Sequence, residues 1–354
     1  MSPVSNTEPD LEYCHDTVQE VSRTFALTID ALGDPLADEI CVGYLLCRIP
    51  DTIEDASHIP VATKSDLLQT FRATVASTST TTSNGFVDAI QPWISTGTDS
   101  ADWDLVRNAP TVIETFEAFD AKTKTAMRQP IQELTTGMIR FVERYAAENG
   151  LRIQSDLELR SYTHYVAGTV GTMITNLLTR ESLPKEQRQT LETTKEAFGR
   201  LLQLVNISKD VYEDYTTENN IYLPAEWLAK EGVPQAELLS ERNRTGVTRV
   251  IERVLTRAES HLSPAREFIQ AMPIESGNTV AAWAIPYLLA VGTLRELQAN
   301  PTNALEADAV KVPRSEVYAI AAAINETGRA NLEGLQRIVA DQRLDEFEGP
   351  ITHV

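Results

Sequence analysis

The chain has 354 residues, with 31 Lys and Arg against 51 Asp and Glu, which gives a formal net charge of −20. This balance excludes an ordinary nucleic-acid-binding domain, because phosphate backbones are bound by clustered Lys and Arg. The three Cys show no CxxC spacing, so neither a disulfide framework nor a zinc site is expected. The acidic residues are spread along the chain, which favours a salt-rich (halophilic) host, with an ordinary acidic cytosolic protein as the alternative.

The hydrophobic periodicity is helical nearly throughout, and strand-like alternation is nowhere sustained. The N-terminal ten residues are polar and no run of 18 apolar residues occurs, so we expect neither a secretory signal nor a membrane span. Residues 77–85 read as an exposed loop. In chain order, the pattern predicts helices at about 11–32, 36–53, 110–148, 156–181, 185–215, 224–231, 235–240, 244–271, 277–298 and 314–340.

No segment has the composition of a linker between two domains. We therefore expect one all-α domain over residues 1–354, with residues 1–8 and 345–354 frayed. Its location is expected to be cytoplasmic, either soluble or peripherally attached to a membrane.

Two acidic motifs share the pattern D-x-x-E-D, each directly after a strongly apolar stretch. In a helix, positions i, i+3 and i+4 lie on one face, so three like charges repel one another there. Mg²⁺ would offset this repulsion, since it binds carboxylates together with substrate phosphates. Solvated helix faces are the alternative interpretation. The predicted metal ligands are Asp51, Glu54, Asp55, Asp210, Glu213 and Asp214.

Several further segments, in the same order along the chain, are similar to motifs of the squalene/phytoene synthase family. The similarity spans about residues 11–340 and includes both acidic motifs. Its central segment, Y-T-H-Y-V-A-G-T-V-G at 162–171, is closest to the squalene-forming branch of that family. The other matching segments are S-R-T-F at 22–25, Y-L-L-C-R at 44–48, Q-L-V-N-I-S-K at 203–209, Y-L-P at 222–224 and A-I-P at 284–286.

The resemblance implies an all-α, isoprenoid-synthase-type bundle around a central cavity. It also implies a Mg²⁺-dependent, head-to-head condensation of two farnesyl diphosphates through presqualene diphosphate, followed by NADPH-dependent reduction to squalene. No Rossmann fingerprint occurs in the chain, so NADPH would bind within the helical cavity. Peripheral membrane contact for product release is a further expectation.

The resemblance also implies roles for individual residues. Tyr162 would take part in proton transfer, Tyr44 would stabilise cationic charge, and Tyr165 is the neighbouring catalytic candidate. His164 is interpreted as structural, because it is two positions from Tyr162 and points away from that face. The diphosphate-binding candidates are Ser22, Arg23, Arg48, Gln203, Asn206 and Lys209; the cavity candidates are Phe25, Val166, Gly168, Val170 and Ile174; the NADPH-binding candidates are Lys311 and Arg314.

Some observations leave alternatives open. The apolar stripe that contains Val166, Val170 and Ile174 is, by spacing alone, more typical of an ordinary core. Gly168 and Gly171 could serve close helix packing or make room for a prenyl tail. Two departures from the family pattern are Asn219-Asn220, where an Arg is usual, and Pro313 within the basic segment. A phytoene or dehydrosqualene synthase without reduction, a chain-elongating or cyclising prenyl-diphosphate enzyme, and a non-enzymatic helical interaction protein remain the rival hypotheses.

Overall fold

Helices account for nearly all regular structure in the computed structural model of this chain, which confirms the all-α prediction. The structure describes residues 10–76, 81–94, 100–148, 150–273, 279–327 and 331–349, without the side chains of 23–24, 81–84 and 327. No strand occurs within these ranges, and an isolated parallel bridge joins Arg152 and Ile221. The helices are α1 (Leu11–Val21), α2 (Arg23–Asp30), α3 (Leu36–Asp55), α4 (Val61–Ala76), α5 (Thr81–Ile94), α6 (Ala101–Arg107), α7 (Ala109–Ala118), α8 (Ala121–Arg144), α9 (Asp156–Thr163), α10 (Thr169–Thr179), α11 (Lys185–Lys209), α12 (Val211–Thr216), α13 (Ala225–Lys230), α14 (Arg244–Glu259), α15 (Leu262–Gln270), α16 (Thr279–Ala299), α17 (Arg314–Thr327) and α18 (Leu332–Asp341).

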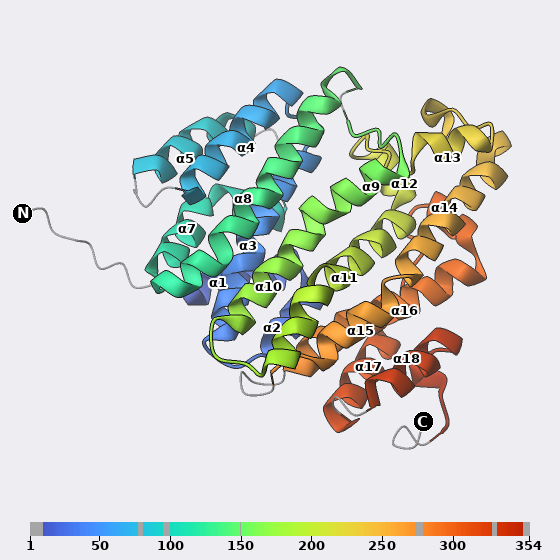
Figure 1. The fold of residues 1–354 in the computed structure, drawn as a ribbon. Helices are drawn as coiled ribbons and strands as arrows, with labels where there is room; N and C mark the ends of the chain where they lie inside the picture. Colours follow the sequence, from blue (N-terminus) through green and yellow to red (C-terminus); the bar gives the residue numbers. More distant parts are fainter. Residues whose placement is uncertain are drawn as a thin grey trace, which may run out of the picture.

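The long helices run side by side and enclose one apolar interior. Figure 1 shows α8, α10, α11 and α15 crossing the molecule in parallel, with α4, α5 and α7 on one flank and α13 and α14 on the other. The contacts between α8 and α10, α10 and α11, and α11 and α15 make this layer continuous. Buried residues from Cys14 to Leu344 form a single hydrophobic cluster. This shared core supports the single-domain organisation, which itself stays a prediction.

Several predicted helices are broken where a polar side chain caps a new helix. The expected helix over 11–32 is two helices, because Ser22 is extended (φ −156°, ψ 89°) and its side chain accepts a hydrogen bond from the backbone N–H of Phe25. Asp120 caps α8 in the same way through the N–H groups of Lys122 and Thr123. Such caps satisfy the unpaired donors of a helix's first turn. Periodicity alone did not locate these breaks, because both sides of each break carry the same helical pattern.

Other expectations about element boundaries were also wrong. The predicted loop at 77–85 is helical from residue 81, where α5 begins, whereas 77–80 lie outside the described residues. The segment 244–271 is divided between α14 and α15. Near the C-terminus a 3₁₀ turn spans Leu344–Glu346, with ion pairs from Arg343 to Asp345 and Glu346, and the fraying expected over 345–354 stays a prediction. Residues 1–9 and 350–354 lie outside the described part of the chain.

A π-helical turn at His164–Gly168 joins α9 to α10. Its i→i+5 bonding places one extra residue in the turn, which shifts the register of all that follows. The continuous α-helical stripe expected through Val166, Val170 and Ile174 is therefore interrupted at its start. Single π-turns inside helices often occur at functional sites, and this one begins two residues after Tyr162.

Close packing explains the glycines of this segment. A Cβ at Gly171 would lie 1.9 Å from the carbonyl oxygen of Lys195, and a Cβ at Gly168 would lie 3.1 Å from a carboxylate oxygen of Glu196. Both glycines thus face α11. At Gly171 only a residue without a side chain allows this approach to the backbone, whereas Gly168 lies against the side chain of Glu196 and its place in a cavity wall stays a prediction.

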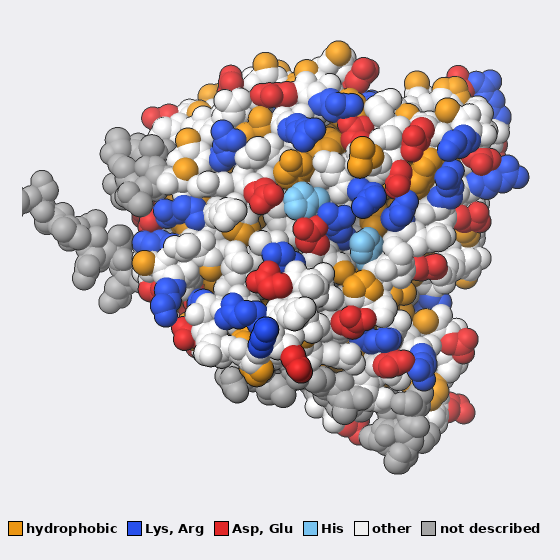
Figure 2. Space-filling model, viewed as in Figure 1, with side chains coloured by type: hydrophobic (Ala, Val, Ile, Leu, Met, Phe, Trp, Pro, Cys, Tyr) orange, Lys and Arg blue, Asp and Glu red, His pale blue; other side chains and the backbone are white. Residues whose placement is uncertain are grey.

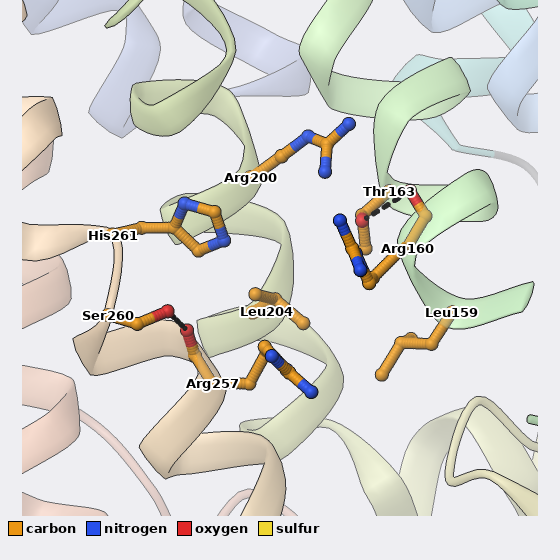
Figure 3. A pocket seen from close by; sticks show the side chains of 8 residues that line it. All are labelled: Leu159, Arg160, Thr163, Arg200, Leu204, Arg257, Ser260 and His261. Carbon is orange, nitrogen blue, oxygen red and sulfur yellow. Dashed lines mark hydrogen bonds between the residues drawn. The ribbon is translucent and has the colours of Figure 1, made fainter. Parts of the chain in front are cut away.

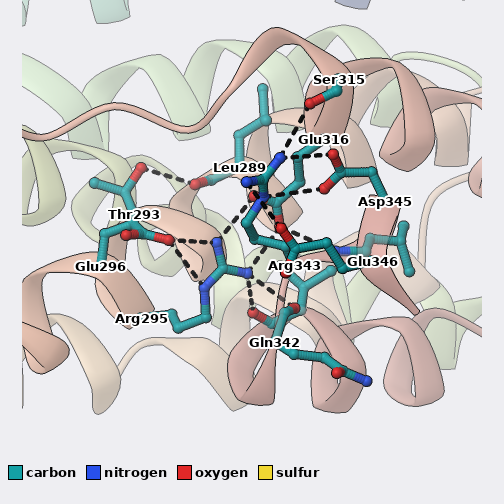
Figure 4. Close-up of polar contacts among 12 residues, drawn as sticks. Leu289, Thr293, Arg295, Glu296, Ser315, Glu316, Gln342, Arg343, Asp345 and Glu346 are labelled. Carbon is teal, nitrogen blue, oxygen red and sulfur yellow. Dashed lines mark hydrogen bonds and ion pairs between the residues drawn. The ribbon is translucent and has the colours of Figure 1, made fainter.

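A buried ion pair joins the C-terminal helices to the core. The guanidinium of Arg295 on α16 donates to both carboxylate oxygens of Glu316 on α17, at 2.8 and 2.9 Å (Figure 4). The same guanidinium donates to the carbonyls of Val339 and Gln342 at the end of α18. The bidentate geometry satisfies the carboxylate of Glu316, which is fully buried, and the two carbonyls accept further from the Arg295 guanidinium.

Helix α16 is long and apolar enough to cross a membrane, by length and composition. In the structure, however, 72% of its apolar window is buried against other helices. Because the core helix of a folded domain passes the same test, this is weak evidence for a membrane span. The sequence expectation of no spanning segment stays a prediction.

Candidate active site

The first acidic motif occupies the C-terminal turn of α3. Asp51 and Asp55 are partly exposed and Glu54 is buried, with 1% of its surface exposed. A helix C-terminus carries partial negative charge, so three carboxylates there are unfavourable beyond their mutual repulsion. Burial, followed by the charge of Asp51, raises the pKa of Glu54 to about 8. Burial and the neighbouring carboxylates also raise the pKa of Asp55 well above its ordinary value.

The second acidic motif lies where α11 ends and α12 begins. Asp210 is the residue between the two helices, and its carbonyl still accepts a hydrogen bond from the N–H of Asp214 at 2.8 Å. The bend therefore keeps one helical turn, and the three carboxylates remain neighbours. Burial, followed by the charges of Glu218 and Asp210, raises the pKa of Asp214 to about 9. The carboxylate of Glu213 accepts the backbone N–H of Asp308 at 2.9 Å.

Glu218 connects the two motifs, which are far apart in the sequence. Its pKa is raised by burial, and the charges of both Asp51 and Asp210 raise it further. Glu218 in turn raises the pKa of Asp55 and of Asp214. The fold thus brings the ends of α3 and α11 together as one acidic cluster, defined as Asp51, Glu54, Asp55, Asp210, Glu213, Asp214 and Glu218.

Positive side chains at the cluster only partly offset this charge. Arg48 donates to Asp51 at 2.6 Å and to Asp102, on α6, at 2.8 Å. The ammonium of Lys209 lies 2.9 Å from a carboxylate oxygen of Asp210. Two of the three predicted phosphate-binding cations therefore lie beside the acidic motifs. Each is paired with a carboxylate when no ligand is present.

The donor set fits Mg²⁺ shared with a diphosphate. Both carboxylate oxygens of Glu54 are buried without a hydrogen-bond partner, although a buried charge of this kind is costly unless it is paired. Buried Lys64 donates to the main-chain oxygen of Glu54 at 2.7 Å. Among the described residues, no three acidic, His or Cys side chains converge on one metal position. Mg²⁺ typically takes one or two carboxylates and completes its shell with water and substrate phosphates, so a prebuilt cage is not required.

Two buried tyrosines border the acidic cluster. The hydroxyls of Tyr162 and Tyr222 are 3.3 Å apart. Burial, followed by nearby carboxylates that include Glu54 and Asp55, raises the pKa of Tyr162 well above 10. Burial, followed by Tyr162 and acidic neighbours, does the same for Tyr222. Both phenols are therefore protonated at neutral pH, and Tyr162 can donate or relay a proton but cannot act alone as a base.

Asn220 positions this pair. It is buried, with 2% exposed, and its Nδ2 donates to the Tyr222 hydroxyl at 3.1 Å and to Glu218 at 3.3 Å. Its Oδ1 accepts the N–H of Leu151 at 2.9 Å. Asn219 adopts a left-handed conformation (φ 58°), and its side-chain oxygen accepts a hydrogen bond from Arg152 at 2.6 Å. The Asn219-Asn220 pair thus shapes the turn after α12, and it supplies no positive charge where the family pattern has an Arg.

A row of aromatic rings leads from the cluster into the core. Burial raises the pKa of Tyr44, the nearby Arg48 lowers it, and the nearby Asp51 raises it. The ring of Tyr44 stacks on Phe25 with centroids 4.2 Å apart, and Phe25 lies 6.5 Å from Trp283. The ring centroids of Trp283 and Phe198 are 5.7 Å apart, and the indole N–H of Trp283 is buried without a hydrogen-bond partner. These contacts form a continuous row of packed aromatic rings, whose faces attract positive charge.

The remaining candidates are placed as follows. Tyr165 packs against Gly137 of α8 and against the ring of His164, whose nitrogens contact Glu133 and Glu196. Ser22 uses its hydroxyl to cap α2, while the side chain of Arg23 lies outside the described residues. Gln203 is half-buried and Asn206 is exposed, on α11 before Asp210; Val166 and Val170 are half-buried and Ile174 is buried.

Of the predicted cofactor-binding residues, Lys311 is linked to the second acidic motif through Asp308. Lys311 is exposed and its ammonium is 2.7 Å from Asp308, the residue whose N–H reaches Glu213. Lys209 also lowers the pKa of Asp308, after the contribution of Lys311. Arg314 is exposed at the start of α17. Two ammonium groups thus flank the loop beside the cluster, a donor set that suits a phosphate-bearing ligand.

Sequence reasoning missed Asp102, Lys64, Glu218, Asn220, Tyr222 and Trp283 as members of this site. One of them carried a readable signal, since Glu218 follows Asp214 by four residues, the spacing of one helical face. Tyr222 begins a segment that resembles the family, and Asn220 lies where the family pattern has an Arg, but neither was assigned to the site. Asp102, Lys64 and Trp283 come from separate helices, and no spacing in the sequence connects them to the acidic motifs.

Known proteins resemble this chain over most of its length. The pattern that defines the squalene/phytoene synthase family matches residues 18–316. The Botryococcus squalene synthase of Botryococcus braunii is 26% identical over 299 residues, covering 84% of this chain and 60% of that protein. The squalene synthase of Dictyostelium discoideum is 25% identical, covering 82% and 64%. The chain thus spans less than two thirds of the length of these two relatives.

Solved structures share the fold. A complex of TcSQS with the ligand BPH1237 has a TM-score of 0.78 at 23% identity, covering 95% of this chain and 92% of that chain. A dehydrosqualene synthase crystallised with a ligand has a TM-score of 0.64 at 19% identity, covering 90% and 95%. At these identities the likeness concerns the fold.

Proposed function

Because the chain belongs to the squalene/phytoene synthase family, whose members are prenyltransferase-type enzymes, we propose that it condenses two farnesyl diphosphates head to head. The proposed product of this coupling is presqualene diphosphate, which is then reduced with NADPH to squalene. The observation that carries the proposal is the acidic cluster, with its unpartnered Glu54, at the entrance of the aromatic row. It joins a diphosphate-binding surface to an apolar interior, which are the two parts of an allylic diphosphate.

The chain's own residues have distinct roles in this proposal. Asp51, Asp55, Asp210 and Asp214 would hold Mg²⁺, which when bound neutralises diphosphate and makes it a better leaving group. Arg48 and Lys209 exchange their carboxylate partners for phosphate oxygens, since charge-assisted hydrogen bonds to phosphate are equally strong. Glu54 and Glu213 would be the other two carboxylate ligands of the Mg²⁺ site.

The interior protects and steers the allylic cation left by ionisation. Tyr44, Phe25 and Trp283 present ring faces and exclude water, which would otherwise quench the cation. Tyr162, protonated and beside Tyr222, relays the proton lost during cyclopropane formation, and the released diphosphate is its proposed acceptor. Lys311 and Arg314 would bind the phosphates of NADPH, which when bound supplies the hydride for reduction. Tyr165 has the smaller proposed role in catalysis, because it packs against Gly137 and His164.

A dehydrosqualene or phytoene synthase is the second candidate function, because it needs the same cluster without a hydride donor. The protein is proposed to act in the cytoplasm, free or in peripheral contact with a membrane that receives its product. The salt-rich host remains a proposal based on the net charge of −20.

Product analysis tests these proposals. The purified protein is incubated with farnesyl or geranylgeranyl diphosphate, with Mg²⁺ or excess EDTA, and with or without NADPH. We expect squalene only with farnesyl diphosphate, Mg²⁺ and NADPH together. The double variant Lys311→Ala/Arg314→Ala should raise the KM for NADPH and leave the first coupling unchanged. Dehydrosqualene or phytoene formed at the same rate with and without NADPH would show that the non-reductive function is correct.

A further inference from the structure

A pocket lies outside the acidic cluster. It has a volume of about 200 Å³ and is bordered by α9, α11 and the junction between α14 and α15. None of its lining residues belongs to the acidic cluster or to the aromatic row. The lining residues are Leu159, Arg160, Thr163, Arg200, Leu204, Arg257, Ser260 and His261.

Positive charge dominates this cavity. The lining contains three guanidinium groups, one each from α9, α11 and α14, and no carboxylate (Figure 3). Arg200 pairs with Glu196 at 2.6 Å and Arg257 with Asp156 at 2.7 Å. Within the described part of the chain, no carboxylate lies within ion-pair distance of Arg160. Figure 2 shows the same concentration of Lys and Arg around the His side chains of this face, in a chain whose net charge is −20.

Two further observations show that the positive charge of the lining is only partly compensated. The Nε of Arg200 is buried without a hydrogen-bond acceptor, although buried polar groups are normally paired. The pKa of His261 is lowered by burial and then by Arg200, Arg257 and Arg160, with only Glu196 acting in the other direction. The imidazole therefore experiences a positive potential from three separate helices.

We propose that this cavity is a binding site for a small phosphoryl anion, such as inorganic phosphate or diphosphate, separate from the catalytic cluster. Guanidinium groups match phosphate oxygens with pairs of parallel N–H donors. The volume is below the roughly 300–1,000 Å³ of pockets for drug-sized ligands, so it suits a compact anion with water. A polyanionic chain is disfavoured, because the rest of the surface is acidic. A bound anion links α9, α11 and α14, and therefore stabilises the native state.

Isothermal titration calorimetry on the full chain, in EDTA and at constant ionic strength, tests the site. EDTA removes the metal needed for diphosphate at the acidic cluster, so this test is independent of the proposed reaction. The variant Arg160→Gln removes a guanidinium that has no carboxylate partner, and Arg160→Lys keeps the charge without the paired donors. The matched control is Arg140→Gln, an exposed position on α8 outside the cavity.

We expect diphosphate to bind the wild type and the control equally, and Arg160→Gln at least tenfold more weakly, with Arg160→Lys between them. The melting temperature should rise with diphosphate in the wild type and rise less in Arg160→Gln. Equal affinity in wild type and Arg160→Gln, or no binding of either anion by the wild type, would overturn the proposal. Cosedimentation with phosphatidic acid vesicles, lost in Arg160→Gln and without binding of free anions, would overturn the assignment to a free anion.

Discussion

Replacing Glu54 by Gln should make the metal-free protein more stable while removing its activity. The carboxylate oxygens of Glu54 are buried with no hydrogen-bond partner at ordinary distance. Burial and the charge of Asp51 outweigh the opposing effects of Lys64 and Tyr162, and raise the pKa of Glu54 from 4.5 to about 8. The native state therefore binds more protons than the unfolded chain between these pH values. By linkage, the free energy of unfolding falls as pH rises from about 4.5 to about 8, and the destabilisation is complete above that range.

The magnitude follows from the same observation. The full difference in pKa corresponds to an upper bound of about 5 kcal/mol, at about 1.4 kcal/mol per pH unit. Because the neighbouring carboxyls titrate together with Glu54, part of this is shared among them. A gain of ~1–3 kcal/mol on neutralisation is therefore expected, the usual cost of leaving a buried polar group unpaired.

Urea denaturation in EDTA, at pH 5 and pH 8.5, measures the effect. Glu54→Gln should be more stable than wild type at pH 8.5 and close to it at pH 5, where Glu54 is already protonated. The control Glu252→Gln, exposed on α14, should change neither value. Mg²⁺ with inorganic diphosphate should stabilise the wild type but not Glu54→Gln. The reasoning is refuted if Glu54→Gln gains nothing at pH 8.5, or gains equally at both pH values.

Four further predictions follow from the site and the packing. Asp51→Asn and Asp210→Asn should each lower turnover at least a hundredfold with the fold intact by circular dichroism, since each removes ligand charge at constant volume; wild-type activity in excess EDTA would contradict this. Tyr162→Phe should lower kcat more than it changes KM, and Tyr165→Phe should have the smaller effect; the reverse order would mean that the wrong tyrosine was assigned. Gly171→Ala should lower the free energy of unfolding by about 1–3 kcal/mol, because its Cβ would meet the Lys195 carbonyl, whereas Gly85→Ala, with open space around it, should be neutral or stabilising. The melting temperature should rise between about 0.1 and 2 M KCl as salt screens the net charge, and a flat or falling curve would count against a salt-rich host.

The sequence by itself determined the fold class, most of the long helices and the local chemistry, whereas the helices between residues 61 and 107 were not predicted. Hydrophobic periodicity is a local property, so it identified the helical segments that carry Asp51 and Asp210, and with them the all-α class. The D-x-x-E-D spacing placed carboxylates within one turn of each other for the same reason. Even the squalene/phytoene synthase family could be recognised from short segments, because each motif is contiguous along the chain.

Only the tertiary structure decided what lies opposite these motifs. Glu218 joins the acidic groups, Tyr222 meets Tyr162, and Trp283 extends the aromatic row, yet each comes from a different helix or turn. The breaks at Ser22 and at Asp120 depend on side-chain caps that compete with helix continuation, which periodicity does not register.

The basic cavity shows the same limit most clearly. The pocket brings together Arg160, Arg200 and Arg257, which are far apart in the acidic sequence. No cluster of basic residues along the chain predicted this grouping. The three residues meet because α9, α11 and α14 pack with these faces adjacent, and packing is decided by the buried sides of the helices. The three Arg side chains come together at the surface as a consequence of this packing. The order of residues along the chain does not show such a grouping.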